Sequence, residues 1–421
     1  MSNWHPVSDF VAFTTKGITP KYVNNSSVVV LNQKCIRDNK INYSFAQFTN
    51  DSQSLPKNKF VQNGDILVNS TGTGTAGRCA FVSKLPEDRR LIVDSHILIL
   101  RCRSYPEAQC LSYILFSFEQ KLMEFMTGSS GQSELDKIVL LNLKTNLTRD
   151  LDSQRKIANI LSRIDSKIEL NNEINAELEQ MAKTLYDYWF VQFDFPDING
   201  KPYKSSGGKM IWSEELKREI PEGWVVGTLS DISNLYRGVS YGKNDIKCKG
   251  DMGVIPILRA TNITGNTVDL NNMVYVPSKF VSQKQLLNKF DIIITMSSGS
   301  KDHIGKNAYY YFEDIVGFGA FCAKIVAKEN YKYYLYSFTQ SDFMFSTIRN
   351  ECLGTNINNL NSAMVNGFKI IIPPSGFIRN FNTLVASSYS VIANNQIESK
   401  NLTEIRDWLL PMLMNGQVKV N

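Results

Sequence analysis

Two stretches of the chain repeat apolar residues at helical spacing over an unusual length. Residues 154–190 contain no Pro or Gly, and a heptad frame places mostly apolar side chains at positions a and d. The second stretch, residues 376–410, follows Pro373-Pro374 and ends before Pro411, which should stop a helix near that point. Each apolar stripe has an Asn near its middle. The pattern predicts two long helices that pair as an antiparallel coiled coil.

The predicted seam between these helices has a polar centre. A buried Asn weakens a coiled coil but fixes its register, and Asn171 and Asn395 would meet in the middle of an antiparallel pair. The alternative is that both are exposed where the seam widens. Asp152 or Ser153 is the expected N-cap of the first helix, and Ser375 that of the second. The seam residues are Ile157, Ile164, Asn171, Leu178, Leu185, Phe381, Asn395, Leu402 and Leu409, and the same frame adds Ile174, Met181, Leu384, Val391 and Ile405.

The segments that precede the two helices resemble each other. Val28–Asn42 and Ile255–Asp269 each contain an apolar strand, a polar turn and a second short apolar segment. Further along, Asp65 and Asp291 each lead an apolar strand, and a polar loop with glycines follows each strand. The matches keep one order and a nearly constant offset, which indicates a duplicated domain.

We therefore predict an α+β fold with a pseudo-twofold internal repeat. Two related globular domains are joined by the two long antiparallel helices, and a segment rich in Pro, Gly, Ser and Lys connects the first helix to the second domain. The predicted boundaries are 1–148 for the first domain, 149–190 for the first helix, 191–221 for the connecting segment, 222–372 for the second domain, and 373–421 for the second helix and tail.

The composition argues against a membrane protein and a metal site, but it does not indicate a function. The chain of 421 residues has 46 Lys and Arg against 40 Asp and Glu, which permits a nucleic-acid partner but does not require one. It has no apolar run long enough to cross a bilayer and no signal-peptide pattern, so we expect a soluble, cytoplasmic protein without a membrane partner. The seven cysteines form no CxxC pair and the three histidines show no metal-ligand spacing, so we expect reduced thiols and no metal site.

Motifs for catalysis are missing where they would be recognised. An adenine methyltransferase would carry an Asn- or Asp-Pro-Pro-aromatic loop, but this chain has only Pro373-Pro374 within IIPPSG. The loop TGTGTAGR is rich in glycine but lacks the Gly-Lys-Ser/Thr that holds phosphates and magnesium in a P-loop. We expect a chain without catalytic residues, and an enzyme with an unrecognised site, such as a nuclease, stays an alternative.

The segment between the two halves carries a family resemblance. The run Tyr186–Phe190, followed by FDFP, NGKPYKSSGG and REIPEGW, is similar to the central region of the specificity subunits of type I restriction–modification systems. The GDILV strand with GR at the end of its loop, and NNEI in the first helix, resemble the same family. The resemblance implies two target-recognition domains that each read half of a bipartite, asymmetric DNA site, with the helices fixing the gap between the halves.

The resemblance also implies partners. The chain would bind double-stranded DNA and two adenine methyltransferase subunits, and restriction subunits would join through the methyltransferases. The chain itself would bind no cofactor, whereas its partners would use S-adenosylmethionine, ATP and Mg. The alternative is a coiled-coil scaffold that binds only proteins, and sequence-dependent DNA binding would exclude it.

Polar loops at matching places in the two halves are the candidate DNA contacts. Glycines let a backbone approach DNA closely, hydroxyls and backbone N–H groups bind phosphates, and Arg or Lys can bind guanine edges. Ordinary connections between strands are the alternative. The aromatic runs Tyr309–Phe312 and Tyr331–Phe338 should pack in the core rather than stack on bases. The candidates are Gln33, Lys34, Arg37, Ser70, Thr71, Thr73, Thr75, Arg78, Ser129 and Gln132 in the first half, and Arg259, Thr261, Ser298, Lys301, Lys306, Thr355 and Asn356 in the second.

Overall fold

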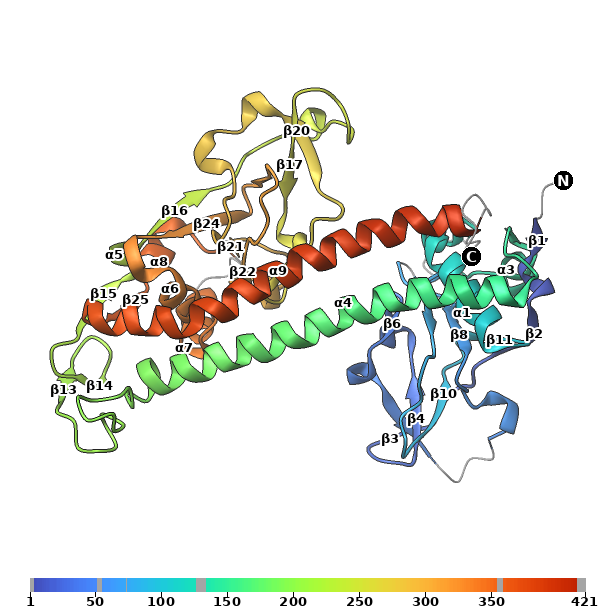
Figure 1. Cartoon of the computed structure of the whole chain (residues 1–421), viewed down its shortest axis with the longest axis horizontal. Helices are drawn as coiled ribbons and strands as arrows, with labels where there is room; N and C mark the ends of the chain where they lie inside the picture. Colours follow the sequence, from blue (N-terminus) through green and yellow to red (C-terminus); the bar gives the residue numbers. More distant parts are fainter. Residues whose placement is uncertain (1–3, 51–54, 73, 126–133, 354–358, 415–421) are drawn as a thin grey trace. The chain divides into compact units, whose positions relative to one another are not determined.

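Two long helices, α4 (Leu151–Tyr186) and α9 (Ser375–Met414), are each shared by two folding units (Figure 1). The computed structural model describes residues 4–50, 55–72, 74–125, 134–353 and 359–414. Unit 1 comprises residues 1–168 and 401–421, and unit 2 comprises residues 169–400. The predicted α+β fold with two long paired helices is confirmed. Among the described residues, no helix is both long and apolar enough to span a membrane.

A four-stranded antiparallel sheet lies at the centre of unit 1. Side chains of an inner strand alternate between two cores, since Leu98 and Leu100 pack on helices whereas Ile97 and Ile99 face a second sheet. Residues two apart share one face of a strand, so this sheet is buried on both faces. Its order is β2 (Val11–Lys16), β11 (Ile97–Cys102), β8 (Asp65–Asn69), β9 (Cys79–Phe81).

The other elements of unit 1 cover the two faces of this sheet. The helices are α1 (Tyr105–Ser117), α2 (Glu119–Glu124) and α3 (Lys137–Asn142). The second sheet has the order β10 (Arg90–Val93), β4 (Val28–Leu31), β7 (Gln47–Thr49), β3 (Tyr22–Val23). Two short pairs complete the unit, β5 (Ile36–Arg37) with β6 (Lys40–Ile41) and β1 (His5–Pro6) with β12 (Lys144–Thr145).

Unit 2 repeats this arrangement. Its central sheet has the order β16 (Ser233–Arg237), β24 (Cys322–Ala327), β21 (Ile292–Thr295), β22 (Asn307–Tyr309). The parallel pair of β10 with β4 has its counterpart in β23 (Gly317–Phe318) with β17 (Val254–Leu258), which also pairs with β20 (Val274–Pro277). The pairs β18 (Ile263–Thr264) with β19 (Thr267–Val268) and β15 (Val225–Thr228) with β25 (Lys369–Ile372) match the short pairs of unit 1. Its helices are α5 (Leu229–Ile232), α6 (Lys332–Thr339), α7 (Asp342–Leu353) and α8 (Ser362–Asn366).

Each of the two aspartates that lead the apolar strands is buried and pairs with a cation of a neighbouring strand. The Asp65 carboxylate accepts two hydrogen bonds from Arg101, at 2.7 Å from Nε and 2.8 Å from Nη2. The Asp291 carboxylate lies 3.0 Å from Lys324 Nζ. Each pair joins two central strands, β8 to β11 and β21 to β24, so the charges are compensated where they are buried. The partner cations stand at different places on their strands, since Arg101 lies opposite Asp65 whereas Lys324 lies opposite Ile293. The two units therefore share the buried aspartate but not the position of its partner.

The segment after α4 folds as part of the core of unit 2. The chain leaves α4 through a π-helical turn at Asp187–Val191. The Phe190 ring lies 5.1 Å from that of Phe381, and the Phe195 ring stacks 5.0 Å from that of Trp224. The hairpin of β13 (Met210–Ser213) and β14 (Arg218–Pro221) follows. The aromatic residues of the resemblance motif thus bind the end of α4 to the start of α9, which explains why the motif is rich in large apolar rings.

The ends of the long helices differ from the sequence prediction. The carboxylate of Asp150, rather than Asp152 or Ser153, caps α4, accepting a 2.8 Å hydrogen bond from the backbone N–H of Ser153. The C-terminal end of α9 also differs from the prediction, because this helix continues through Pro411 to Met414. Proline removes one helical hydrogen bond, but Leu410 and Leu413 on either side of it are buried in the core of unit 1, which offsets the loss.

The buried stripes of α4 and α9 follow the natural period of an α-helix. The heptad frame places Ile174 and Met181 in the seam, yet their exposed fractions are 37% and 64%. Asn175 and Ala182, one residue further on, are buried instead. On α9, Leu384, Val391 and Ile405 are likewise exposed. A helix with about 3.6 residues per turn drifts from a strict 3.5-residue repeat with every heptad. This drift explains why the heptad frame places these exposed residues in the seam.

The core of the predicted seam is apolar with a polar centre. Ile157, Asn171 and Phe381 are buried, whereas Ile164, Leu178, Leu185, Asn395, Leu402 and Leu409 are partly buried. In unit 2, the Asn171 Nδ2 donates to Glu398 Oε2 at 2.9 Å and lies 3.5 Å from the Asn395 carbonyl, and the Asn395 Nδ2 donates to Asn175 Oδ1 at 2.9 Å. The two asparagines therefore meet inside the seam, and the exposed alternative is wrong for Asn171, whose exposed fraction is 0%.

Candidate nucleic-acid interface

Two candidate segments of unit 1 lie against each other. The Gln33 Nε2, from the 3₁₀ turn that follows β4, donates to the Thr71 hydroxyl at 2.7 Å and to the Thr71 carbonyl. The Asn69 Nδ2 donates to the Gln33 carbonyl at 3.1 Å. These bonds cross between segments distant in the sequence, so the structure brings together the turn at 33–37 and the loop at 70–78.

Several hydroxyls of this loop hold the loop itself. Ser70 is buried, and its hydroxyl donates to the His96 carbonyl at 2.9 Å. The Thr71 hydroxyl lies 2.8 Å from His96 Nδ1, and the Thr75 hydroxyl lies 3.3 Å from the Gly72 carbonyl. Because Ser70 is buried and its hydroxyl donates within the protein, it is a positioning residue rather than a surface contact.

The cationic candidates of unit 1 are more accessible. Lys34 and Arg37 are exposed, and Arg78 is half-buried. The Arg37 Nε lies 3.6 Å from the Asp38 carboxylate, which is an exposed contact of small energetic value. Among the described candidates of unit 1, these three cationic side chains are suited to meet DNA.

Glu119 of α2 anchors this surface, and no sequence pattern marks it. Its Oε1 accepts 2.8 Å hydrogen bonds from Asn39 Nδ2, in the β5–β6 turn, and from the backbone N–H of Cys79 at the start of β9. Burial raises the pKa of the Glu119 carboxyl above its usual value, while the hydrogen bond from Cys79 and the charge of Arg78 oppose the rise. One carboxylate of α2 thus connects the two segments that carry the candidates Arg37 and Arg78.

The turn after β17 in unit 2 presents different side chains. Arg259 and Thr261 are exposed, and the Arg259 Nη2 donates to the Asn272 carbonyl at 2.7 Å. Asn262 is buried and its Nδ2 donates to the Asp269 and Asn271 carbonyls at 2.9 and 2.7 Å. The buried amide shapes the turn, while its exposed neighbours face solvent.

The loop after β21 borders a cavity. Lys301 and Lys306 line a hollow of about 460 Å³ together with Arg349 of α7. Ser298 is half-buried, and its hydroxyl accepts from the backbone N–H of Ser300 at 3.3 Å. Arg349 was missed by the sequence analysis because its place depends on the packing of α7 against this loop.

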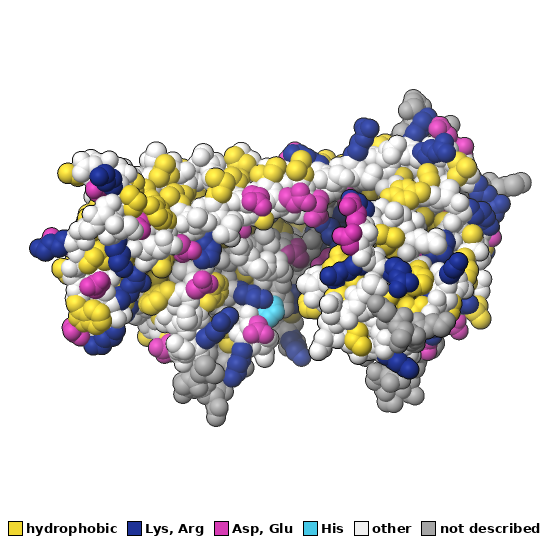
Figure 2. Space-filling view, turned by 90° about the horizontal axis from the view of Figure 1, so that it is seen from below, with side chains coloured by type: hydrophobic (Ala, Val, Ile, Leu, Met, Phe, Trp, Pro, Cys, Tyr) yellow, Lys and Arg dark blue, Asp and Glu magenta, His cyan; other side chains and the backbone are white. Residues whose placement is uncertain are grey.

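Some of the predicted DNA-contact residues lie outside the described residues, and the residues of one predicted core segment are buried. Thr73, Ser129, Gln132, Thr355 and Asn356 are outside the described residues. The aromatic run Tyr309–Phe312 is buried, as predicted. On the face seen in Figure 2, Lys and Arg side chains are interspersed with acidic and uncharged ones. Charge alone therefore does not mark the interface on that face.

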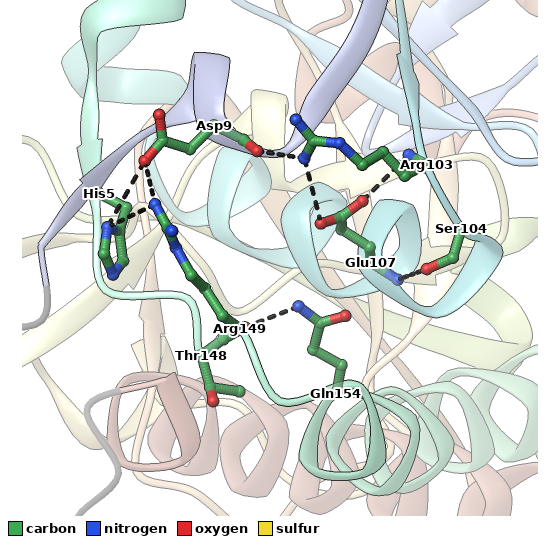
Figure 3. Close-up of polar contacts among 8 residues, drawn as sticks. All are labelled: His5, Asp9, Arg103, Ser104, Glu107, Thr148, Arg149 and Gln154. Carbon is green, nitrogen blue, oxygen red and sulfur yellow. Dashed lines mark hydrogen bonds and ion pairs between the residues drawn. The ribbon is translucent and has the colours of Figure 1, made fainter.

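A polar cluster at the N-terminus of unit 1 has a structural role. Figure 3 shows the Asp9 carboxylate between His5 and Arg149, with the His5 Nδ1 3.6 Å from Asp9 Oδ2 and 3.2 Å from the Arg149 Nη2. The two hydroxyls of the cluster are engaged elsewhere: that of Ser104 accepts from the Glu107 N–H at 3.4 Å, and that of Thr148 accepts from the Asp150 N–H at 3.2 Å. No hydroxyl of the cluster bonds the imidazole, so the cluster ties the first strand to the segment before α4 and is not a nucleophile–base pair.

Comparisons with known proteins match both halves of the chain. A family model described as the type I restriction modification DNA specificity domain matches residues 18–180 and 221–377. The specificity subunit of the EcoKI type I restriction enzyme of Escherichia coli is 32% identical over 205 residues, which span 48% of this chain and 44% of that protein. The alignment thus covers less than half of that relative.

Two further matches extend over nearly the whole chain. The specificity subunit of the HindI type I restriction enzyme of Haemophilus influenzae is 24% identical over 477 aligned positions, covering 99% of this chain and 100% of that protein. A crystal structure of a type I restriction–modification S subunit from M. genitalium superposes with a TM-score of 0.52 and 17% identity, covering 97% of this chain and 95% of that one. At this identity, the structural match supports the fold.

Proposed function

The chain belongs to the family of type I restriction–modification DNA specificity subunits, and from that premise we propose that it reads a bipartite, asymmetric DNA sequence on behalf of catalytic partners. Residues 1–148 and 222–372 are the two target-recognition domains, and α4 and α9 are the spacer between them. The chain performs no chemistry and binds no cofactor. Its partners are two adenine methyltransferase subunits, and restriction subunits join through them, with S-adenosylmethionine, ATP and Mg used by those partners.

The observation that carries this proposal is the duplicated scaffold with unlike loops. Both units build the same central sheet, with a buried Asp that pairs with a cation and with the same turn-and-loop arrangement. The side chains presented there differ, with Lys34 and Arg37 in one unit and Arg259 and Thr261 in the other. A duplicated scaffold with different contact residues suits a reader of two different half-sites, because specificity comes from side chains that reach base edges.

The proposal is tested by mapping N6-methyladenine in host DNA with and without this gene, while the methyltransferase partner is kept expressed. We expect one split motif with two specified parts to lose methylation when the gene is deleted. An unchanged map, with the partner shown to be present, would contradict the proposal. Binding of the purified complex to DNA carrying that motif, measured over a salt series, would separate a DNA reader from a scaffold that binds only proteins.

A further inference from the structure

The cavity beside the β21 loop is lined by cationic and apolar side chains. It measures about 460 Å³. The side chains of Ile304, Phe345 and Ile348 form the apolar part, and those of Lys301, Lys306 and Arg349 supply positive charge. Asp302 is the one acidic residue among those that line it. The hollow therefore combines surface for a sugar or base with groups that bind an anion.

The three cations lack compensating acids. Among the described residues, no carboxylate lies within ion-pair distance of Lys301, Lys306 or Arg349, although exposed lysines elsewhere in unit 2 are paired, as Lys217 is with Glu214 at 2.8 Å. Lys301 and Arg349 are exposed, and Lys306 is half-buried. Like charges around one hollow repel each other unless an anion enters, so the cavity favours an anionic ligand.

The equivalent place in unit 1 is organised differently. In both units a glycine of the loop packs against a helix residue. A Cβ added to Gly77 would lie 3.1 Å from Leu122 Cβ in unit 1, and a Cβ added to Gly305 would lie 2.5 Å from Ile348 Cδ1 in unit 2. Three residues before these helix positions, unit 1 has Glu119 and unit 2 has Phe345. The carboxylate that closes the surface in unit 1, and that would repel an anion, is thus replaced by a ring in unit 2.

In unit 2, the Asn of the β18–β19 turn has a different hydrogen-bond partner from its counterpart in unit 1. Asn39 of unit 1 donates to Glu119, whereas Asn266 of unit 2 donates to Glu179 of α4 at 2.9 Å. The turn is therefore held by the long helix, and Gly265 and Asn266 line the cavity rather than close it. The described residues that line the opening all belong to unit 2, and Asp302 is the acidic one among them.

We propose that this cavity binds a phosphate of the DNA backbone beside the second half-site, with Arg349, Lys306 and Lys301 as its ligands and the attached sugar against the apolar lining residues. The inference rests on the proposed function and adds a contact that positions unit 2 on the duplex without reading bases. Phosphate contacts fix register and orientation, and they contribute equally to all sequences.

The test compares Arg349→Gln with Lys204→Gln, an exposed lysine of unit 2 that does not line the cavity. Affinity of the full-length chain, assembled with its methyltransferase partner, is measured for duplexes with and without the recognition sequence over a salt series. We expect Arg349→Gln to weaken both duplexes by the same factor and to reduce the salt slope of binding by about 1. Lys204→Gln should leave the affinity and the slope unchanged.

The outcomes separate this inference from the proposed function. If the unaltered complex shows no sequence-dependent binding, the proposed function fails. If it binds with specificity and Arg349→Gln binds identically with the same salt slope, the cavity contact is wrong. Loss of binding to the specific duplex alone would also overturn it, because that would make Arg349 a base contact. A thermal-shift response to inorganic phosphate or a free mononucleotide that Arg349→Gln abolishes, without any change in DNA binding, would assign the cavity to a free anion and overturn the DNA source.

Discussion

At the residue scale, individual buried or half-buried acidic side chains stabilise the elements that carry the candidate surface. Asp65 and Asp291 are paired with cations in the central sheets. Glu119 instead accepts hydrogen bonds from a turn and a strand, with no cation as its direct partner among the described residues. A carboxylate in this position supports the fold through its hydrogen bonds while its burial opposes the charge.

Replacing Glu119 separates these two effects. Glu119→Gln keeps an oxygen that can accept from Asn39 and Cys79, whereas Glu119→Ala leaves the Cys79 N–H without its partner and should cost about 1–3 kcal/mol of stability. Chemical denaturation of both variants beside the unaltered protein measures the difference. Equal stability of the Gln and Ala variants would show that the hydrogen bonds have no net value.

The raised pKa of Glu119 also predicts a dependence on pH. Because burial raises the folded pKa above the usual value of 4.5, the folded state binds more protons between those two values, and this group favours folding more as pH falls through that window. Glu119→Gln lacks this contribution. Its stability relative to the unaltered protein should therefore be highest near about pH 7 and decline toward about pH 4.5. A difference that stays constant with pH would be inconsistent with the raised pKa.

At the element scale, the pairing of α4 with α9 combines apolar packing with specific polar contacts. In unit 1, the Arg406 Nη1 donates to Asp165 Oδ1 at 2.9 Å, and the Tyr113 hydroxyl donates to Asp165 Oδ2 at 2.6 Å. In unit 2, Asn171 is fully buried, yet no described residue hydrogen-bonds to its Oδ1. A buried amide of this kind costs stability and restricts the alignments that the helices can adopt.

Asn171→Leu should therefore stabilise the helix pair by about 1 kcal/mol, because it removes an unsatisfied buried oxygen and adds apolar contact. Asn172→Leu is the matched control, since Asn172 is the exposed neighbour on the same helix. Thermal unfolding of both variants gives the comparison. A lower midpoint for Asn171→Leu than for the control would mean that the bonds to Glu398 and Asn395 outweigh the cost of burying the amide.

At the scale of the whole molecule, each unit has its own core and its own set of candidate contacts. The clusters around Leu98 in unit 1 and Ile294 in unit 2 contain residues of their own unit. A change in one loop should therefore leave the fold of the other unit intact. This independence is what a reader of two separate half-sites requires.

Arg78→Ala should consequently relax or abolish recognition of one half-site and leave the other unchanged, because Arg78 lies on the loop of unit 1. Arg259→Ala, on the exposed turn after β17, is the counterpart in unit 2. Methylation maps of cells that carry each variant report which half of the split motif loses its specified bases. If either variant altered both halves to the same extent, the model of two independent readers would be wrong.

The sequence by itself determined the large-scale organisation of this protein. The spacing of apolar residues predicted both long helices, the offset matches predicted the duplication, and the aromatic run at Tyr186–Phe190 pointed to the family that the comparisons confirm. These features are visible in one dimension because helical periodicity, repeats and motifs are local or recur along the chain.

Only the tertiary structure decided which side chains the surface presents. The inward hydroxyl of Ser70, the anchor at Glu119 and the place of Arg349 beside Lys306 depend on contacts between segments far apart in the sequence. The seam residues also required three dimensions, because a small difference between 3.5 and about 3.6 residues per turn accumulates along α4 and turns Met181 outward. Periodicity predicts that a face is buried, but the packing partner determines which residues complete it.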